Sequence, residues 1–459
     1  MTKTTAIILA GGQGTRMKSP LPKVLHPVAG QPMIIRIVGQ CVKAAIEEVR
    51  IVVGHGQGLV KSIVEPLGVA TYVQEKQLGT ADAVKSAHVD SLEGDVVILN
   101  GDHPLITAED IKGFITDFRE RKLDLAVVSV ELDNAKEFGR IIRQNNQLKA
   151  IVEAKDASSE TLKIKEVNTG IYVVKATLLK KFLPQISNKN SKGEFYLTDL
   201  ISIALDNKCV VDAVVSKNKH VAHGVNNQVE LAEATKYVYS QKCQQLMNEG
   251  VIILDPQSTY IEETVVIGAG SVIYPNVFIR GKTAVGPFCV IEPNAFISEA
   301  IIQDGVQIKA GTYIEQAVIK SQAKLGPYAR IRPDSTIGEH AHIGNFVELK
   351  KVNFGKNSKA GHLTYLGDAD IGEDVNIGCG TITCNYAADR KKYKTVIKDR
   401  VFVGSDSQLV APVEIGADAI IASGTTVTKN VPQGALAIGR AKQENKEGYA
   451  KKFSSSKKS

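Results

Sequence analysis

The stretch "IEETVVIGAGSVIYPNVFIRGKTAVGPFCVIEPNAFI", Ile261 to Ile297, carries an aliphatic residue at every sixth position. This period matches neither the 3.6-residue repeat of an α-helix nor the two-residue alternation of a strand. It matches one short strand followed by one tight turn. Gly268 and Gly286 follow aliphatic positions, where glycine adopts turn conformations that β-branched residues resist. The repeat therefore predicts a left-handed parallel β-helix, in which each short strand pairs with those of the coils above and below.

The six-residue period continues toward the C-terminus and loses its phase twice over long spans. Both spans, Leu349 to Ile371 and Ile377 to Ile397, concentrate His, Tyr, Asn and Lys residues. Because loops that interrupt a repeat gather on one face of a solenoid, we expect these two interruptions to carry function. The repeat alone leaves open a purely structural or oligomerising stalk.

The N-terminal half has a different pattern. A short apolar strand, Ala6 to Leu9, runs into the glycine-rich turn "AGGQGTRM", and later strand candidates "VRIVVG", "DVVILNGD" and "DLAVVSV" alternate with helical stretches. This alternation predicts a Rossmann-like three-layer α/β domain that binds its ligand at the carboxyl ends of the strands. The turn lacks the third glycine of GxGxxG and the GK[ST] of a P-loop. Its backbone amides can still bind phosphates, with Arg16 and Lys23 close behind.

Length and charge define the domains and exclude some classes of function. The 459 residues divide into a nucleotide-binding domain (1–225), a linker helix (226–250), a β-helix (251–440) and a basic tail (441–459). Five of the seven net positive charges lie in the last twenty residues, so no broad basic face for nucleic acid is expected. No apolar run is long enough to span a membrane, and the six cysteines lack metal-type spacing. We expect a cytoplasmic protein with reduced thiols.

The segment "LAGGQGTRMKSPLPKVL", Leu9 to Leu25, resembles the LxxGxGTRMxxxxPK signature of sugar-1-phosphate nucleotidyltransferases. With the repeat behind it, the chain from about residue 4 to 440 is similar to a family of bacterial envelope synthesis. Its members act as both N-acetylglucosamine-1-phosphate uridyltransferase and glucosamine-1-phosphate N-acetyltransferase. The resemblance implies acetyl transfer from acetyl-CoA to glucosamine-1-phosphate, followed by magnesium-dependent uridylyl transfer from UTP with release of pyrophosphate.

The same resemblance assigns a first site in the N-terminal half. It implies that Asp102 and Asn226 hold Mg²⁺ through oxygen atoms, which suit a hard cation, and that Arg16 stabilises the charge on the departing pyrophosphate. The other residues that it assigns to nucleotide and sugar binding are Leu9, Ala10, Gly11, Gly12, Lys23, Gln74, Gly79, Thr80, Asn100, Gly101, Gly139, Glu153 and Asn168.

A second site is implied in the repeat. An amine must lose a proton before it attacks a thioester, and histidine, with a pKa of about 6.5, can accept that proton near neutral pH. His362 of "AGHLTYLG" matches the family's catalytic base. The residues matched to glucosamine-1-phosphate binding are Arg332, Lys350, Tyr365 and Asn376. Those matched to acetyl-CoA binding are Cys379, Asn385, Tyr386, Lys392, Ser405, Ser423 and Arg440.

Some positions depart from the family pattern. Asn100 stands where members carry tyrosine, Cys379 and Ser423 stand where they carry small alanines, and a loop longer by one residue leaves Lys391 as an alternative to Lys392. We expect changed affinities from these departures, because none of them removes a charged or titrating group.

Two other functions compete with the bifunctional enzyme. A nucleotidyltransferase with a merely scaffolding β-helix would have a chemically plain repeat, which His362, Asn385 and Lys392 contradict. A non-catalytic module would not need Arg16 and Asp102 together. Because solenoids of this kind usually associate as parallel trimers, we expect a homotrimer. We expect small-molecule substrates and no nucleic-acid or membrane partner.

Overall fold

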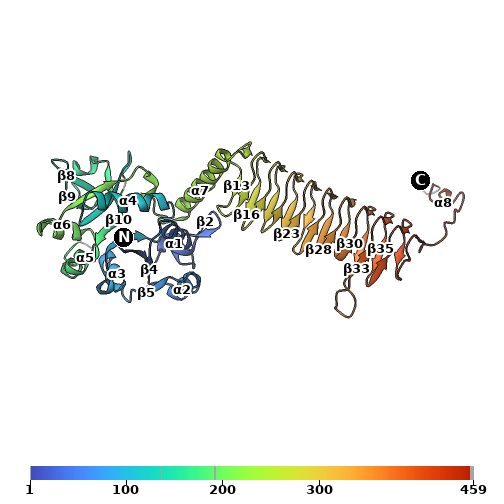
Figure 1. Ribbon diagram of the computed structural model, residues 1–459, viewed down its shortest axis with the longest axis horizontal. Coiled ribbons are helices and arrows are strands. Elements are labelled where there is room, and N and C mark those ends of the chain that lie inside the picture. Colours follow the sequence, from blue (N-terminus) through green and yellow to red (C-terminus); the bar gives the residue numbers. More distant parts are fainter. Residues whose placement is uncertain (1, 136, 191–192, 455–459) are drawn as a thin grey trace. The chain divides into compact units, whose positions relative to one another are not determined.

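The computed structural model describes residues 2–135, 137–190 and 193–454. The chain divides into two compact units, Met1–Val238 and Tyr239–Ser459, each with its own hydrophobic core (Figure 1). The division falls within helix α7 (Gln228–Asn248), the segment for which the sequence predicts a linker helix. In the described ranges no helix is long and apolar enough to cross a membrane.

The first unit is built on one mixed sheet with the strand order β11-β7-β10-β6-β1-β4-β5. Six of these strands run parallel: β1 (Thr4–Ala10), β4 (Glu48–Val53), β5 (Ala70–Val73), β6 (Asp95–Asn100), β7 (Leu125–Glu131) and β11 (Val211–Val215). Between β6 and β7 lies the antiparallel strand β10 (Glu166–Lys175), which also pairs with the hairpin of β8 (Arg140–Gln144) and β9 (Gln147–Val152). A two-residue pair, β2 (Pro27–Val28) and β3 (Gln31–Pro32), stands apart.

Helices cover both faces of this sheet, which confirms the predicted three-layer fold. One apolar cluster joins the sheet to α1 (Met33–Lys43), α2 (Gln57–Val64) and α4 (Ala108–Glu120). A second joins the other face to α3 (Thr80–Ser86), α5 (Ala176–Phe182) and α6 (Asp199–Asp206).

Strand register brings the ends of four strands to the same edge. Ala10 of β1 lies opposite Val53 of β4, which lies opposite Val73 of β5, and Leu9 lies opposite Asn100 of β6. The glycine-rich turn, Gln74 and Gly101 therefore follow neighbouring strands directly.

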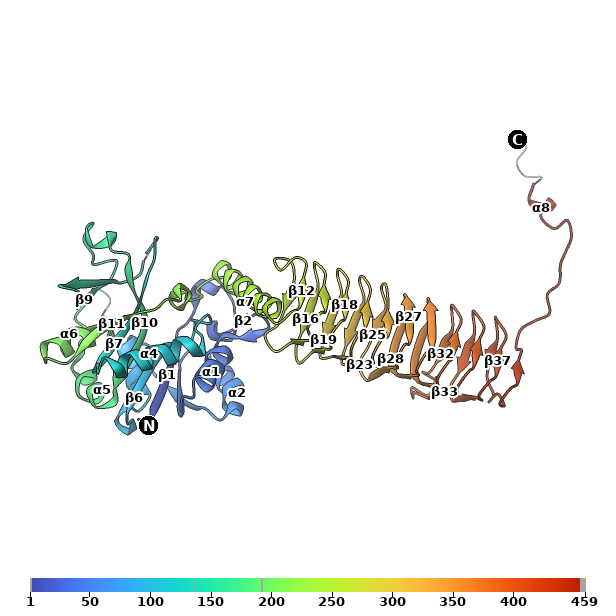
Figure 2. The ribbon, with the colours of Figure 1, turned by 45° about the horizontal axis from the view of Figure 1, so that its top comes forward.

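The second unit is a parallel β-helix of stacked three-sided coils, as the repeat predicts (Figure 2). The first face holds β12 (Ile252–Ile253), β15 (Val272–Ile273), β18 (Val290–Ile291), β21 (Gln307–Ile308), β24 (Lys324–Leu325), β27 (His342–Asn345), β29 (Lys359–His362), β31 (Asn376–Ile377), β34 (Phe402–Val403), β37 (Ile420–Ile421) and β39 (Leu436–Ala437). The sixth-position aliphatic residues point inward and pair with their equivalents one coil away, for example Ile273 with Ile291, both fully buried.

The second and third faces form one continuous sheet. Its strands are β13 (Tyr260–Ile261), β14 (Val266–Ile267), β16 (Phe278–Arg280), β17 (Ala284–Val285), β19 (Phe296–Ser298), β20 (Ile301–Ile302), β22 (Tyr313–Glu315), β23 (Ala317–Ile319), β25 (Arg330–Ile331), β26 (Ser335–Ile337), β28 (Glu348–Phe354), β30 (Tyr365–Ile371), β32 (Ile382–Cys384), β33 (Thr395–Ile397), β35 (Gln408–Val410), β36 (Val413–Ile415) and β38 (Thr426–Val427). A short helix, α8 (Lys451–Ser454), follows the last coil.

One sequence interpretation is wrong. The span from Leu349 to Ile371 contains no inserted loop, because Phe354, Ala360 and Leu366 occupy the inward positions and are buried. The six-residue period loses its phase in this span only because two turns between the second and third faces are one residue shorter than a regular turn. The other span does contain an insertion, residues 385–394 between β32 and β33, seen in Figure 1 as a loop that projects from the coils.

Candidate active sites

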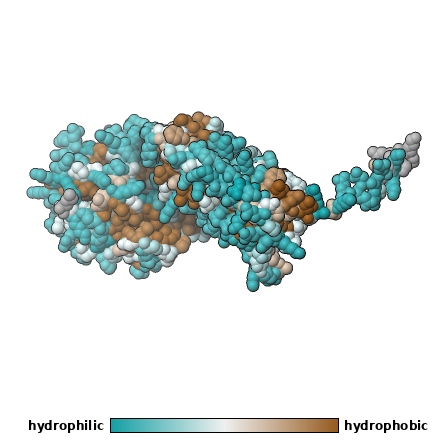
Figure 3. Space-filling model, turned by 45° about the vertical axis from the view of Figure 1, so that its right-hand side comes forward, coloured by the Kyte–Doolittle hydropathy of each residue, from teal (hydrophilic) through white to brown (hydrophobic). Residues whose placement is uncertain are grey.

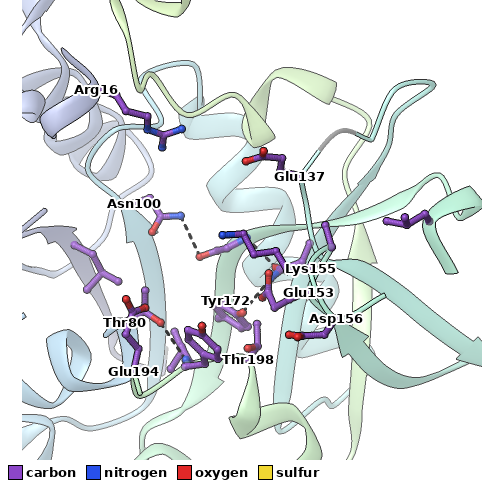
Figure 4. A pocket seen from close by; sticks show the side chains of 17 residues that line it. Arg16, Thr80, Asn100, Glu137, Glu153, Lys155, Asp156, Tyr172, Glu194 and Thr198 are labelled. Carbon is purple, nitrogen blue, oxygen red and sulfur yellow. Dashed lines mark hydrogen bonds between the residues drawn. The ribbon is translucent and has the colours of Figure 1, made fainter. Parts of the chain in front are cut away.

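A cleft of about 860 Å³ opens at the carboxyl edge of the first unit's sheet. Leu9 and Asn100 at the ends of β1 and β6, and Asn168 and Tyr172 of β10, line it (Figure 4). Because β10 runs antiparallel to β6, the segment around Gly170 and Tyr172 lies beside the end of β6, although the two strands are far apart in sequence. Asn100 Nδ2 donates to the carbonyl oxygen of Gly170 at 3.4 Å.

A positively charged corner lies next to this cleft, where the glycine-rich turn meets the chain before α7. Lys23 Nζ forms an ion pair with Asp102 and donates to Asn226 Oδ1 at 2.7 Å, and Arg16 Nη2 donates to the same Oδ1 at 2.9 Å. One ammonium nitrogen thus touches oxygen atoms of both Asp102 and Asn226. The two oxygens converge on a point that a cation can occupy.

The electrostatics of this corner keep Asp102 ionised. Burial by itself would raise the pKa of the Asp102 carboxyl, but the neighbouring positive charges of His103 and Lys23, and the hydrogen bond from Lys23, lower it below its ordinary value. His103 is held in place by a 3.0 Å contact between its Nδ1 and the carbonyl oxygen of Val221. At neutral pH the site therefore presents a carboxylate.

A smaller cavity of about 380 Å³ adjoins the cleft and is lined by the glycine-rich turn, Gln74, Gly79, Thr80 and Asp102. Gln74 Nε2 donates to the carbonyl oxygen of Gly79 at 3.2 Å and to Asp82 Oδ2 at 2.9 Å. Gly11 lies close to it, and an added Cβ at Gly11 would make a tight contact of 3.0 Å with Gln74 Oε1. These contacts fix the amide of Gln74 at the cavity wall.

The structure brings together the residues that the resemblance assigned to the sugar. Glu153 lines the cleft together with Asn168, and Asn168 N donates to the carbonyl oxygen of Gly139 at 2.9 Å. Sequence reasoning missed other residues of the same wall: Glu137, Lys155, Asp156, Tyr172, Glu194, Tyr196 and Thr198. They follow no motif, and only the tertiary contacts among β10, the β8–β9 hairpin and the segment before α6 bring them to the cleft.

The second group of predicted residues lies along one edge of the β-helix, which we name the His362 edge: the turns at Asn345, His362, Cys379, Ser405 and Ser423 between the first and second faces. Backbone hydrogen bonds stack these turns, such as Leu363 N to the carbonyl oxygen of Asn345 at 3.0 Å and Gly424 N to that of Ser405 at 2.8 Å. Arg440 Nη1 donates to the carbonyl oxygen of Ser423 at the end of the row.

His362 is exposed on this edge and has a side-chain partner. Its Nδ1 lies 2.7 Å from Oδ1 of Asn345, the residue one coil away in register. Because an amide oxygen only accepts hydrogen bonds, this contact places the proton on Nδ1 and leaves Nε2 as the basic nitrogen. Sequence reasoning missed Asn345, since the contact follows from coil stacking.

Cationic groups gather at the next edge of the coils, between the second and third faces. Hydrogen bonding and charge from Lys392, together with the charge of Arg332, lower the pKa of Lys350. The inserted loop is closed by an antiparallel bridge between Tyr386 and Lys392. The structure thus places Lys392 near Lys350.

The remaining predicted residues lie around these two edges. An added Cβ on Gly367 would collide with the hydroxyl of Tyr365 and with Nδ2 of Asn385, so both side chains cover that glycine on the second face. Asn376 lies on the first face, on β31, next to Lys359. The His362 edge therefore separates Tyr365 from Asn376.

Matches to protein-family models agree with this division. A MobA-like NTP transferase domain matches residues 6–158, a GMPPB C-terminal domain matches residues 256–352, and the six-repeat bacterial transferase hexapeptide matches residues 394–429. The fold and its two groups of polar residues define a nucleotidyltransferase joined to a hexapeptide-repeat transferase.

Similarity to curated proteins extends over the whole chain. It is 61% identical over 448 residues to the bifunctional protein GlmU of Bdellovibrio bacteriovorus, covering 98% of each chain. It is 44% identical to the bifunctional protein GlmU of Alkaliphilus metalliredigens (97% of this chain, 98% of the relative) and to that of Trichlorobacter lovleyi (98% and 99%). The chain belongs to the GlmU family.

Proposed function

We propose a residue-level account of two reactions on this chain, which as a member of the GlmU family is a bifunctional uridyltransferase and acetyltransferase of UDP-N-acetylglucosamine synthesis. The second unit transfers acetyl from acetyl-CoA to glucosamine-1-phosphate. The first unit then joins the N-acetylated product to UTP. The observation that carries the account is that one chain holds both the Lys23–Asp102–Asn226 corner and an exposed His362 oriented as a base.

For uridylyl transfer, the sugar phosphate attacks the α-phosphorus of UTP in line with the departing pyrophosphate. The glycine-rich turn, Lys23 and Arg16 bind the phosphates. Gln74 orients the base through Oε1, which can accept a hydrogen bond, because both hydrogens of its Nε2 are donated to Gly79 and Asp82. Glu153, Asn168 and Gly139 orient the sugar. The reaction needs no covalent intermediate, so positioning and neutralisation of charge supply the rate.

Asp102 and Asn226 fit a magnesium site. Their oxygens already converge on one cationic nitrogen, and carboxylate and amide oxygens are the ligands that a hard cation prefers. When bound, the ion neutralises charge on the phosphates. Arg16 and Lys23, which now donate to Asn226, are close enough to share that task.

For acetyl transfer, Nε2 of His362 takes a proton from the ammonium of glucosamine-1-phosphate, and the resulting amine attacks the thioester carbonyl. Asn345 orients the imidazole. Arg332 and Lys350 bind the sugar's phosphate. We assign Lys392 to the same phosphate, although the resemblance matched it to acetyl-CoA, because it lies beside Lys350. Tyr365 and Asn376 contribute to the binding of the sugar. The other residues of the His362 edge, with Asn385, Tyr386 and Arg440, bind acetyl-CoA.

Exposed apolar side chains on the His362 edge support a homotrimer. Tyr328, Phe346 and Leu363 follow one another in successive turns, and each is more than half exposed. Figure 3 shows further apolar surface near the last coils. Burying such surface favours association, and a second copy of the chain would cover the exposed side of the His362 edge. The soluble substrates of both reactions support a cytoplasmic location.

The test of the account is a dual assay of the purified protein. With glucosamine-1-phosphate and acetyl-CoA it should release free CoA thiol, and EDTA should leave that rate unchanged. With N-acetylglucosamine-1-phosphate and UTP it should form UDP-N-acetylglucosamine, and EDTA should abolish this reaction until Mg²⁺ is restored. Thiol release that requires Mg²⁺, or uridylyl transfer that does not, would contradict the assignment of the ion to the first unit alone.

Replacing Lys392 with Ala should weaken use of glucosamine-1-phosphate by about tenfold, because one charge-assisted hydrogen bond to the phosphate, about 1.5 kcal/mol, is lost. The pKa of Lys350 should rise at the same time, since Lys392 is the main cause of its lowering. Lys391→Ala is the matched control and should change neither the KM nor the Lys350 titration followed by NMR. Equal effects of both substitutions would contradict the choice of Lys392.

A further inference from the structure

The carboxamide of Asn226 is held by its neighbours on the side away from Lys23. Its Nδ2 donates to the carbonyl oxygen of Gly224 at 3.1 Å and to Oε2 of Glu230 at 3.2 Å. The backbone N of Asn226 donates to the same Glu230 oxygen at 2.7 Å. Because both hydrogens of Nδ2 have acceptors on this side, the nitrogen of the amide is fixed there.

The other side of the same amide faces positive charge. Asn226 Oδ1 accepts from Lys23 Nζ and from Arg16 Nη2. If the amide turned over, Oδ1 would face the Glu230 carboxylate and Nδ2 would face the two cations. Both new contacts would lack a hydrogen bond, and one would repel. Glu230 therefore decides which end of Asn226 points toward the cationic corner.

Glu230 is itself held firmly in the first turn of α7. Asn227 Nδ2 donates to Glu230 Oε1 at 2.9 Å, and Asn227 Oδ1 accepts from Glu230 N at 3.0 Å. The next residue, Gln228, donates from Nε2 to the carbonyl oxygen of Met17 at 3.0 Å, directly after Arg16. The start of α7 is thereby attached to the turn that carries Arg16.

We propose that Glu230 is a positioning residue of the cation site, acting through Asn226 so that the amide oxygen faces the ion. The inference rests on the proposed function, in which Asp102 and Asn226 hold Mg²⁺. The Glu230 carboxylate accepts hydrogen bonds from Asn226 and Asn227, and it affects the ion only through the orientation of Asn226. Partners that orient a metal ligand typically change metal affinity about 10- to 100-fold when they are removed.

The test measures binding of Mn²⁺, a probe for Mg²⁺, to the full-length protein with saturating UDP-N-acetylglucosamine, by the electron paramagnetic resonance signal of free Mn²⁺. Glu230→Ala should weaken Mn²⁺ binding about 10- to 100-fold. Glu230→Gln should recover most of the affinity, because its Oε1 still accepts from Asn226. Glu233→Ala, an exposed glutamate on the same helix, is the matched control and should bind as the unmodified protein does. Thiol release by the acetyltransferase should stay unchanged in all three.

The results that would refute the positioning role of Glu230 differ from the result that would refute the cation site. Unchanged Mn²⁺ affinity in Glu230→Ala would contradict the positioning role. A Glu230→Gln variant as weak as Glu230→Ala, with an unchanged unfolding midpoint, would show that the negative charge of Glu230 matters and the amide orientation does not. An Asp102→Ala variant that binds Mn²⁺ as well as the unmodified protein would instead refute the cation site itself.

Discussion

Replacing His362 with Ala is expected to lower the rate of CoA thiol release by about 10²- to 10⁴-fold, the usual contribution of a positioned general base. At neutral pH the substrate amine is largely protonated, and the substitution removes the imidazole that accepts its proton. Uridylyl transfer in the first unit should be unaffected. The measurement is thiol release with glucosamine-1-phosphate and acetyl-CoA, beside UDP-N-acetylglucosamine formation from the N-acetylated sugar phosphate.

The control for this substitution is His340→Ala, which removes another exposed histidine on a different edge of the same β-helix. It should leave both rates unchanged. Asn345→Ala should lower thiol release less than His362→Ala does, because the base remains but its orientation is lost. Thiol release by His362→Ala at the rate of the unmodified protein would refute His362 as the base.

Replacing Asp102 with Asn is expected to lower UDP-N-acetylglucosamine formation by about 10²- to 10³-fold, as for the loss of one preorganised electrostatic group. The two side chains have nearly the same shape, but Asn leaves Lys23 without its carboxylate partner and gives the cation a neutral ligand. Thiol release should not change.

The loss in Asp102→Asn should also be uniform across neutral pH. A carboxyl whose folded-state pKa is lowered stays charged above its ordinary value and loses that charge only as the pH falls through the lowered one. Asp90→Asn, an exposed position outside the cleft, serves as the control. If Asp102→Asn kept the full rate of uridylyl transfer without added Mg²⁺, this result would contradict the role of Asp102.

The β-helix could be predicted from the sequence because its inward positions repeat in phase, yet the same reasoning misplaced one feature. Phe354 and Ala360 occupy inward positions that Ile, Leu or Val hold in most other coils, so a regular part of the β-helix resembled an insertion. The inward position requires a nonpolar side chain that fits the core. Both residues are nonpolar, although they differ widely in size. His362 consequently lies in a regular turn, and the repeat does not break around it.

The candidate sites were only partly predictable. The glycine-rich turn and "LNGD" lie in local motifs, so the phosphate and cation end of the cleft could be located. Tyr172 and Glu194 could not, because they reach the cleft through the antiparallel strand β10 and the segment before α6. Asn345 contacts His362 through coil stacking, which leaves no motif, and Glu230 contacts Asn226 from the first turn of α7.

We expect two independent sites on one chain to act in sequence, and an assay that mixes two variants measures this. His362→Ala and Asp102→Asn are purified separately and supplied with glucosamine-1-phosphate, acetyl-CoA, UTP and Mg²⁺. Neither alone should form appreciable UDP-N-acetylglucosamine. Mixed together they should form it, because N-acetylglucosamine-1-phosphate released by Asp102→Asn diffuses to the intact first unit of His362→Ala. A mixture as inactive as either variant alone would contradict the account.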